Sequence, residues 1–557
     1  MLLLEVLFLE EPCMSVLPVR FSTYALSIAG LLISLIGLAF DGLWWIGVGV
    51  FAALVTLGTF DLLQRKRTVS RNYPILAHMR YLLESIGPEF RQYFIEADTD
   101  QVPFSREQRN LVYRRAKNDV DKKPFGSLHD MNAPGYEWMS PSLAPVHITD
   151  QNFRIVIGEN RVQPYSASVV NISAMSFGAL SPNALSALNE GARNGGFYHT
   201  TGEGAISPYH LRGGDLVWQL GSGYFGCRRD DGGFDPEKFR RNAQRDEVKM
   251  IEIKLSQGAK PGHGGILPAA KVTREIAVTR GVPAGKDVVS PSCHSTFSTP
   301  REMIGFIQTL RELSGGKPVG IKLAIGHPWE WFAMVKAMRE EGDHPDYIVV
   351  DGGQGGTGAA PLEFINRLGM PLDDALNLVH NTLIGAGLRE QIRIGASGKI
   401  ITAFDICRTM AIGADWVNMA RGFMFSLGCI QAQSCHNDRC PSGVATQDPL
   451  RGKRLDITDK SERVENFHTN TLHALREMLE AAGLQHPGEL GPEHIIRRLD
   501  NGSARPYISL LNRLKPNELL EGGATDHPIY REFWEMATAD SFSAPSEIVK
   551  LRASKLV

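Results

Sequence analysis

The feature that most constrains the fold is a regular alternation of short β-rich runs with helix-like segments between residues 166 and 425. Strand–helix alternation predicts a parallel sheet, because each helical crossover returns the chain to the same edge. An eighth strand is expected around residues 197–202. The seven clearer strands are expected at 167–173, 248–255, 288–290, 319–325, 347–350, 392–395 and 416–419. Helices are expected between them at 181–193, 300–313, 329–340 and 403–412.

The expected strands end in glycine or polar residues, and this is the edge where a (β/α)8 barrel holds its chemistry. We therefore predict an α/β protein whose residues 166–460 form a (β/α)8 TIM barrel. A doubly wound sheet is the alternative, but no Gly-x-Gly-x-x-Gly helix start follows a strand, so dinucleotide binding is not expected. Residues 65–165 are expected to be a helical connector followed by an irregular lead-in. Residues 461–557 are expected to be a helical extension.

Residues 1–64 are predicted to be a membrane anchor made of a two-helix transmembrane hairpin. Two uncharged runs, at about 23–40 and 43–60, are each close to the ~20 residues that cross the hydrocarbon layer. Asp41-Gly42 forms the turn between them, and Trp44-Trp45 stands where an interfacial aromatic belt is found. The alternatives are a cleaved signal peptide, for which no convincing cleavage site is present, and a buried hairpin of a soluble protein.

Basic residues flank the hairpin on both sides. Arg20 precedes it, and Arg65-Lys66-Arg67 and Arg71 follow it. The positive-inside rule then predicts an inner (cell) membrane protein with both termini and the catalytic domain on the cytoplasmic side. The sequence leaves open whether Met1 or Met14 is the start.

Three of the seven cysteines are crowded into one segment, Cys429-x5-Cys435-x4-Cys440-Pro441. Thiolates bind iron well, and several thiolates from one loop can surround a cluster. A proline after the last cysteine is common in iron–sulfur loops, and three ligands favour a [3Fe–4S] cluster. Zinc is the alternative, with His436 as its fourth ligand.

Three glycine-containing loops follow successive expected strands and favour an FMN phosphate site. They are the segment 351–358 with Gly355 and Gly356, then Ser397-Gly398-Lys399, then Ala420-Arg421-Gly422. Barrels often hold phosphate on backbone N–H groups after their last strands, and Arg421 adds positive charge. A plain turn is the alternative for each loop taken singly.

Other strand ends predict the rest of the site. The segment 173–178, which contains Met175 and Ser176, is expected to lie against a flavin ring, with a strand-to-helix turn as the alternative. Lys254, Gln257 and Lys260 lie beside one strand end, where cations suit a dicarboxylate or the pyrimidine edge of a reduced flavin. Lys322 lies inside an apolar strand, where a buried ammonium needs a partner.

Around these residues the chain closely resembles the FMN-binding synthase domain of glutamate synthase. The matching stretches are 175–182, 201–204, 222–226, 253–265, 351–361 and 429–447, in the order that the family has them. The resemblance implies a (β/α)8 barrel that carries FMN and a [3Fe–4S] cluster. It implies that electrons pass from the cluster to FMN, and that reduced flavin gives a hydride to 2-iminoglutarate. That imine forms from 2-oxoglutarate and ammonia, and the product is L-glutamate.

The resemblance also implies roles for individual residues. It makes Cys429, Cys435 and Cys440 the cluster ligands and places Lys254 and Glu203 on the substrate side. It places the following residues on the flavin side: Met175, Ser176, Gln257 and Lys322. The predicted catalytic residues are therefore Lys254, Glu203 and Lys260.

Three departures from the family pattern are expected to matter. The membrane hairpin stands where the family has a glutamine amidotransferase domain, so a separate ammonia source is expected. His263 replaces an acidic residue, and Tyr224-Phe225 replaces Arg-Phe, both in stretches expected near the substrate. The architecture is similar to stand-alone glutamate-synthase-like proteins, and N-methylglutamate synthase subunits use a related barrel with an amine as nitrogen source.

We therefore expect an oxidoreductase that makes L-glutamate or an N-substituted glutamate. Its electrons are expected from a separate protein, such as ferredoxin or an NAD(P)H reductase subunit. The alternatives are a membrane-linked FMN and iron–sulfur dehydrogenase with another substrate, and a non-catalytic assembly subunit. Lys and Arg number 59 against 61 Asp and Glu, so no nucleic-acid partner is expected.

Overall fold

The computed structural model describes residues 19–64, 68–95, 103–522 and 526–553. The chain divides into two compact units, Met1–Ala97 and Asp98–Val557. The domain boundaries expected after residues 64, 165 and 460 stay predictions. Met1, Met14, Cys13 and the basic run Arg65-Lys66-Arg67 lie outside the described residues.

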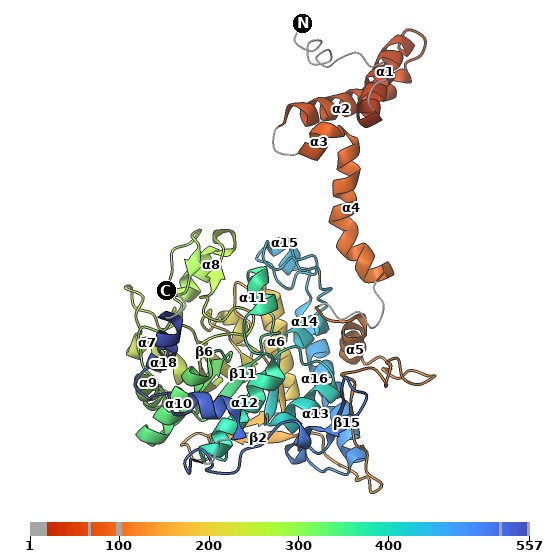
Figure 1. Cartoon of the computed structure of the whole chain (residues 1–557). Helices are drawn as coiled ribbons and strands as arrows, with labels where there is room; N and C mark the ends of the chain where they lie inside the picture. The colour runs from red at the N-terminus through yellow and green to blue at the C-terminus, as the bar shows by residue number, and fades with distance from the viewer. Residues whose placement is uncertain (1–18, 65–67, 96–102, 523–525, 554–557) are drawn as a thin grey trace. The chain divides into compact units, whose positions relative to one another are not determined.

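Within the described residues of the second unit, eight parallel strands close into a barrel surrounded by helices (Figure 1). Around the barrel the order is β4, β5, β6, β7, β10, β11, β12 and β13, and β13 pairs with β4 to close it. The strands are β4 (Val170–Ile172), β5 (His199–Thr200), β6 (Leu216–Leu220), β7 (Val248–Lys254), β10 (Val319–Leu323), β11 (Tyr347–Asp351), β12 (Arg393–Ser397) and β13 (Trp416–Met419). The predicted TIM barrel is confirmed, and closure removes the doubly wound alternative.

Two expectations about individual strands were wrong. The run 288–290 is no barrel strand: β9 (Val288–Val289) pairs antiparallel with β8 (Ile266–Leu267) in a separate two-stranded sheet. The barrel position between β5 and β7 belongs to β6, which the sequence analysis missed. All five residues of β6 are buried. A short, wholly buried run has no alternation of polar and apolar residues, so periodicity cannot identify it.

Helices follow the strands and begin where their capping residues stand. The Ser181 hydroxyl accepts a hydrogen bond from the Ala184 backbone N–H at the start of α6, and Gly196 ends that helix with φ of +66°. The helices of this layer are α6 (Pro182–Gly195), α7 (Pro236–Ala243), α8 (Arg274–Arg280), α9 (Pro300–Leu313), α10 (Pro328–Glu341), α11 (Leu362–Arg367), α12 (Leu372–Gly385), α13 (Ala403–Ile412), α14 (Arg421–Ser426) and α15 (Pro449–Gly452).

Glycines and aromatic rings interlock on adjacent barrel strands. A Cβ at Gly395 of β12 would come within 2.6 Å of the Trp416 ring of β13, and one at Gly320 of β10 would come within 2.5 Å of the Tyr347 ring of β11. All four residues are buried. These positions admit only glycine because the neighbouring ring fills the space of a side chain.

Segments before and after the barrel belong to the same compact unit. Helix α16 packs against α6 and against α5, which precedes the barrel. Strands β1, β14 and β15 form an antiparallel sheet that the expectation of a helical extension did not include. The elements are α5 (Arg106–Lys117), β1 (Glu137–Met139), β2 (Arg154–Ile157), β3 (Tyr165–Ser168), α16 (Ile457–Ala482), β14 (Ile495–Arg498), β15 (Ala504–Pro506), α17 (Pro528–Phe533) and α18 (Ser546–Ala553).

The first unit contains α1 (Ser22–Gly37), α2 (Trp44–Leu63), α3 (Thr68–Asn72) and α4 (Leu76–Phe90). Helices α1 and α2 pack together, and the hydroxyl groups of Tyr24 and Thr59 are 2.8 Å apart. Among the described residues, only α2, with 20 residues, is long and apolar enough to cross a membrane. Helix α1 is apolar but has 16 residues. The transmembrane hairpin therefore stays a prediction.

Candidate active site

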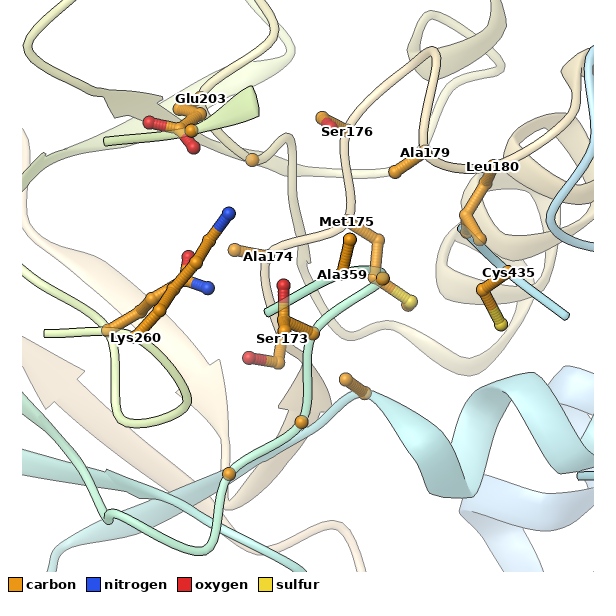
Figure 2. A pocket seen from close by; sticks show the side chains of 18 of the residues that line it. Ser173, Ala174, Met175, Ser176, Ala179, Leu180, Glu203, Lys260, Ala359 and Cys435 are labelled. Atoms are coloured by element: carbon orange, nitrogen blue, oxygen red, sulfur yellow. The ribbon is translucent and has the colours of Figure 1, made fainter. Parts of the chain in front are cut away.

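A cavity of about 220 Å³ opens at the carboxyl ends of the barrel strands (Figure 2). All of the residues predicted as catalytic or FMN-binding line it, although they come from seven different strand ends and loops. These are Met175, Ser176, Glu203, Lys254, Gln257, Lys260, Lys322, Gly355, Gly356, Ser397, Gly398, Lys399, Ala420 and Arg421. The structure thus brings them together, while the role of each residue stays a prediction.

The cavity carries a large excess of positive charge. Among the described residues that line it, seven are Lys or Arg and two are Asp or Glu. The whole chain, in contrast, has a formal net charge of −2. The cations are Lys254, Lys260, Lys271, Arg280, Lys322, Lys399 and Arg421. Four of them are buried, namely Lys260, Lys271, Arg280 and Lys322. Buried cations are stable only with anionic groups nearby, so the cavity suits anionic ligands.

Glu203 and Lys254 form the central ion pair at one side of the cavity. Lys254 Nζ donates a hydrogen bond to Glu203 Oε1 at 2.7 Å, and the two side chains are 12% and 17% exposed. Figure 2 shows Lys260 on the same side, with its amine directed toward Glu203. Burial alone would raise the pKa of Glu203, but the charges of Lys254, Arg280 and Lys260 outweigh burial and lower it. Burial and the charge of Lys254 lower the pKa of Lys260.

A glycine places Glu203 beside the first strand-end loop. Gly202 has φ of +69°, and a Cβ there would lie 2.7 Å from the Ser176 backbone nitrogen. Only glycine permits this conformation and this approach together. The loop after β5 therefore lies directly against the Met175–Ser176 segment, which the sequence analysis assigned to the flavin side.

Lys322 has the buried partner that its position requires. Its Nζ lies 3.8 Å from Asp351 Oδ2, and the same carboxylate oxygen accepts a hydrogen bond of 2.8 Å from the Gly258 backbone N–H. Glu252 is buried nearby and accepts a 2.5 Å hydrogen bond from the Gln219 side chain. Burial raises the pKa of Glu252, and Lys322 opposes that rise. Asp351, at the end of β11, thus contacts both Lys322 on β10 and the loop that follows β7.

The glycine loops form a cationic cradle. Arg421 Nη2 donates to the Thr357 carbonyl at 2.7 Å, and a Cβ on Gly356 would lie 3.1 Å from Arg421 Nε. The guanidinium therefore lies on the Gly356 backbone, where a side chain would displace it. Lys399 extends over the Phe104 ring at 5.8 Å, and burial lowers its pKa. Exposed loop amides with two cations fit a phosphate group, as FMN requires.

The three clustered cysteines follow α14, and only Cys435 lines the cavity. In Figure 2, Cys435 lies on the opposite side of the pocket from Glu203 and Lys260. Burial, together with the nearby Cys435 and Cys440 thiolates, raises the pKa of Cys429 to about 11. Lys271 Nζ donates to the Cys435 carbonyl at 2.8 Å. The thiols are therefore close enough to influence one another, beside a cation.

A single metal ion has no ready-made site here. Among the described residues, no three His, Cys, Asp or Glu side chains converge to hold one ion. The zinc alternative and the [3Fe–4S] cluster both stay predictions. Three cysteine thiols on one loop are the donor type that an iron–sulfur cluster takes.

Two cations of the site, Arg280 and Lys271, were not predicted from the sequence. Arg280 is buried at the end of α8 and donates to the Phe177 carbonyl at 2.8 Å; burial lowers its pKa to about 10. Arg280 and Lys271 are ordinary basic residues in sequence, so no local signal marks them. His263 is exposed and Tyr224 is buried against Thr296 and His294. Neither is among the described residues that line the cavity, and their effect on the substrate stays a prediction.

Comparison with known proteins agrees with this geometry. Residues 139–485 match the family model described as a conserved region in glutamate synthase. The chain is 39% identical to the glutamate synthase large subunit-like protein YerD of Bacillus subtilis, over 84% of this chain and 97% of that protein. It is 36% identical to an archaeal glutamate synthase [NADPH] of Methanocaldococcus jannaschii, over 57% of this chain and 59% of that relative's length.

Among solved structures, a mutant flavocytochrome b2 with pyruvate bound has a TM-score of 0.38 and 12% identity. The match covers 75% of this chain and 85% of that one, and a likeness at this level has no bearing on function. The assignment to a family rests on the family model and on the similar relatives. The chain belongs to the glutamate-synthase-like family of FMN-dependent oxidoreductases.

Proposed function

We propose that this chain uses FMN and an iron–sulfur cluster to reduce 2-iminoglutarate, formed from 2-oxoglutarate and ammonia or an amine. The product is L-glutamate or an N-substituted glutamate. The single observation that carries the proposal is the cavity lined by seven cations and two carboxylates. A flavin phosphate at one side and a dicarboxylate at the other supply the negative charge that these cations require.

The phosphate side of the cavity is the cradle of Arg421, Lys399 and the loop amides. Arg421 and Lys399 would pair with the phosphate oxygens, and the N–H groups of Gly355, Gly356 and Gly398 would donate to them. Bound FMN supplies hydride transfer. Met175, Ser176, Gln257 and Lys322 would hold the ring system, and Lys322 is kept in place there by Asp351.

The substrate side is the group Glu203, Lys254, Lys260 and Arg280. The three cations would bind the two carboxylates of the substrate through charge-assisted hydrogen bonds. Glu203 Oε1 holds Lys254 Nζ in one position before the substrate arrives, so less side-chain freedom is lost on binding. Among the described residues that line this side of the cavity, Glu203 is the carboxylate in hydrogen-bond contact with a basic nitrogen, so it would exchange a proton there.

Cys429, Cys435 and Cys440 would hold the cluster, which supplies one-electron transfer. Cys435 forms part of the cavity wall, so the cluster loop and the flavin cradle are adjacent elements of one site. A separate electron donor, such as ferredoxin or an NAD(P)H reductase subunit, and a separate ammonia source complete the proposed reaction.

We also propose that α2, together with α1, anchors the chain in the inner (cell) membrane, with the barrel on the cytoplasmic side. The support is the length and apolar composition of α2, of whose most apolar window 11% is buried. This helix also favours the second candidate function, a membrane-linked dehydrogenase that exchanges electrons with the quinone pool.

The test is anaerobic purification of the full chain in detergent, followed by visible and EPR spectra and a reoxidation assay. Flavin bands, a three-iron signal, and reoxidation only when both 2-oxoglutarate and ammonium are added would support the proposal. Reoxidation by a quinone, with no response to those two compounds, would favour the dehydrogenase. A protein purified without flavin would overturn both candidates.

A further inference from the structure

We propose that α4 lies in the plane of a membrane, with one apolar face inserted between the lipid headgroups. The inference rests on the proposed membrane anchor and assigns a second lipid-contacting element to it. The apolar face, here called the α4 stripe, consists of Leu76, Met79, Leu83, Ile86 and Phe90.

The α4 stripe is continuous and uncovered within its unit. Its members are spaced by three and four residues, so they lie on one side of the helix. Their side chains are 45%, 59%, 57%, 37% and 51% exposed, in chain order. In a soluble protein, the apolar face of a helix is normally buried against the core. An exposed apolar face of this kind indicates contact with a membrane or with a partner.

The opposite side of α4 is tied to the end of α2. Asp61, which is 2% exposed, lies two residues before the end of that helix. Its Oδ2 accepts a hydrogen bond of 3.0 Å from the Ile75 backbone N–H, and His78 Nε2 lies 2.9 Å away. His78 and the buried Ala77 lie on the face of α4 away from the stripe. The start of α4 is therefore held beside the end of α2, and the α4 stripe faces away from α2.

The backbone turn at Ile75, just before α4, fixes the direction in which α4 leaves α3. Ile75 has φ of +67°, a conformation that a β-branched residue adopts only when its surroundings enforce it. The hydrogen bond to Asp61 supplies that restraint. Helix α4 then runs across the direction of α1 and α2 rather than along it (Figure 1). If α2 spans the bilayer, a helix running across its end lies along the membrane surface.

The position of α4 against the end of α2, together with its length, favours lipid over a second copy of the chain. Arg80 flanks the stripe and pairs with Glu84 at 2.7 Å, on exposed side chains that can reach the headgroups. A coiled coil with a second copy needs apolar positions sustained over at least three heptads. Helix α4 has 15 residues, and the π-helical segment Arg91–Ile95 that continues it has 5, so the whole helical run is still shorter than three heptads. An amphipathic helix of this length is sufficient for an interfacial position.

The test uses the full chain in vesicles of phosphatidylcholine and phosphatidylglycerol. A background without Cys13 and the exposed Cys293 receives one new cysteine at a time: Met79→Cys and Leu83→Cys on the stripe, and Ser85→Cys on the other face as the matched control. Each is spin-labelled, and EPR power saturation compares collision with oxygen and with a water-soluble nickel chelate. The chain with no added cysteine measures labelling of the remaining native thiols.

We expect the two stripe positions to favour oxygen several-fold over the nickel chelate, and Ser85→Cys to favour the chelate. Equal access of the chelate at all three positions overturns the interfacial helix. Exclusion of both reagents from the stripe, with label-to-label dipolar coupling at Leu83→Cys, assigns the stripe to a second copy instead. Failure of the protein to float with the vesicles overturns the membrane anchor as well, so the two proposals fail in distinguishable ways.

Discussion

Two substitutions at one ion pair are expected to change the affinity for a dicarboxylate in opposite directions. Lys254 and Glu203 are 2.7 Å apart, and Lys260 and Arg280 line the same side of the cavity. At neutral pH these four groups have a formal net charge of +2. Lys254→Met lowers that charge to +1, and Glu203→Gln raises it to +3. Electrostatic recognition therefore predicts weaker binding for the first variant and tighter binding for the second.

The sizes of the two effects follow from the geometry. Lys254→Met removes one charge-assisted hydrogen bond, worth about 1.5–3 kcal/mol, which is about a 10- to 150-fold loss of affinity. Glu203→Gln removes a like charge roughly 5 Å from the bound anion, worth at most about 3 kcal/mol at an effective dielectric constant of about 20. The substitution also removes the carboxylate that positions Lys254, and this loss opposes the gain in affinity. We expect about a tenfold tightening, together with slower turnover because the carboxylate is gone.

The assay is titration of the oxidised, flavin-loaded protein with 2-oxoglutarate, followed by the change in flavin absorption. Lys249→Met is the matched control, because Lys249 lies on the same strand at the other end of the barrel and pairs with Asp215 at 3.6 Å. It should leave the affinity unchanged. If Lys254→Met and Glu203→Gln weaken binding equally, the pair is structural and the charge argument fails. If neither changes the affinity, the dicarboxylate binds elsewhere.

Three further outcomes are expected. Arg421→Met should weaken FMN binding by about 10- to 150-fold, because it removes a charged contact to the phosphate. Flavin fluorescence on reconstitution measures the affinity, and Arg421→Lys should restore part of the loss. Full flavin content in both variants would contradict the proposed phosphate cradle. Because burial and Lys254 lower the pKa of Lys260, dicarboxylate affinity should be highest below that lowered pKa and fall as pH rises through it. A Lys260→Met variant should lack this step in its affinity–pH profile, and an unchanged profile would refute the assignment. Gly395→Ala should lower the free energy of unfolding by about 1–3 kcal/mol through overpacking against Trp416, and so lower the melting temperature. Gly305→Ala, whose new Cβ meets nothing within 4 Å, should not.

The sequence was informative where the signal is local or periodic. Alternation of strands and helices predicts the parallel sheet, because each element's period is visible in its own residues. The glycine loops and the cysteine segment are contiguous, so their chemistry can be read without knowing the fold. The pattern was uninformative for β6, whose five residues are all buried, and misleading for Val288–Val289, which pairs antiparallel outside the barrel.

The α4 stripe is visible in the sequence as a helical spacing of apolar residues. Residues 65–165 are expected to begin with a helical connector, and no apolar face is predicted on it. The spacing of Leu76, Met79, Leu83, Ile86 and Phe90 nevertheless marks one apolar face. Composition averages over both faces of a helix, and only periodicity separates them.

Barrel closure decided how the site is assembled. The sequence by itself determined which residue types follow each strand: glycine, lysine, serine and cysteine at seven separate places. Only the tertiary structure set Glu203 against Lys254, brought Arg280 from a short helix to the same side, and joined Asp351 to Lys322. The physical reason is that electrostatic recognition depends on distances between groups far apart in sequence, and those distances exist only after the eight strands close and exclude water from the space between their ends.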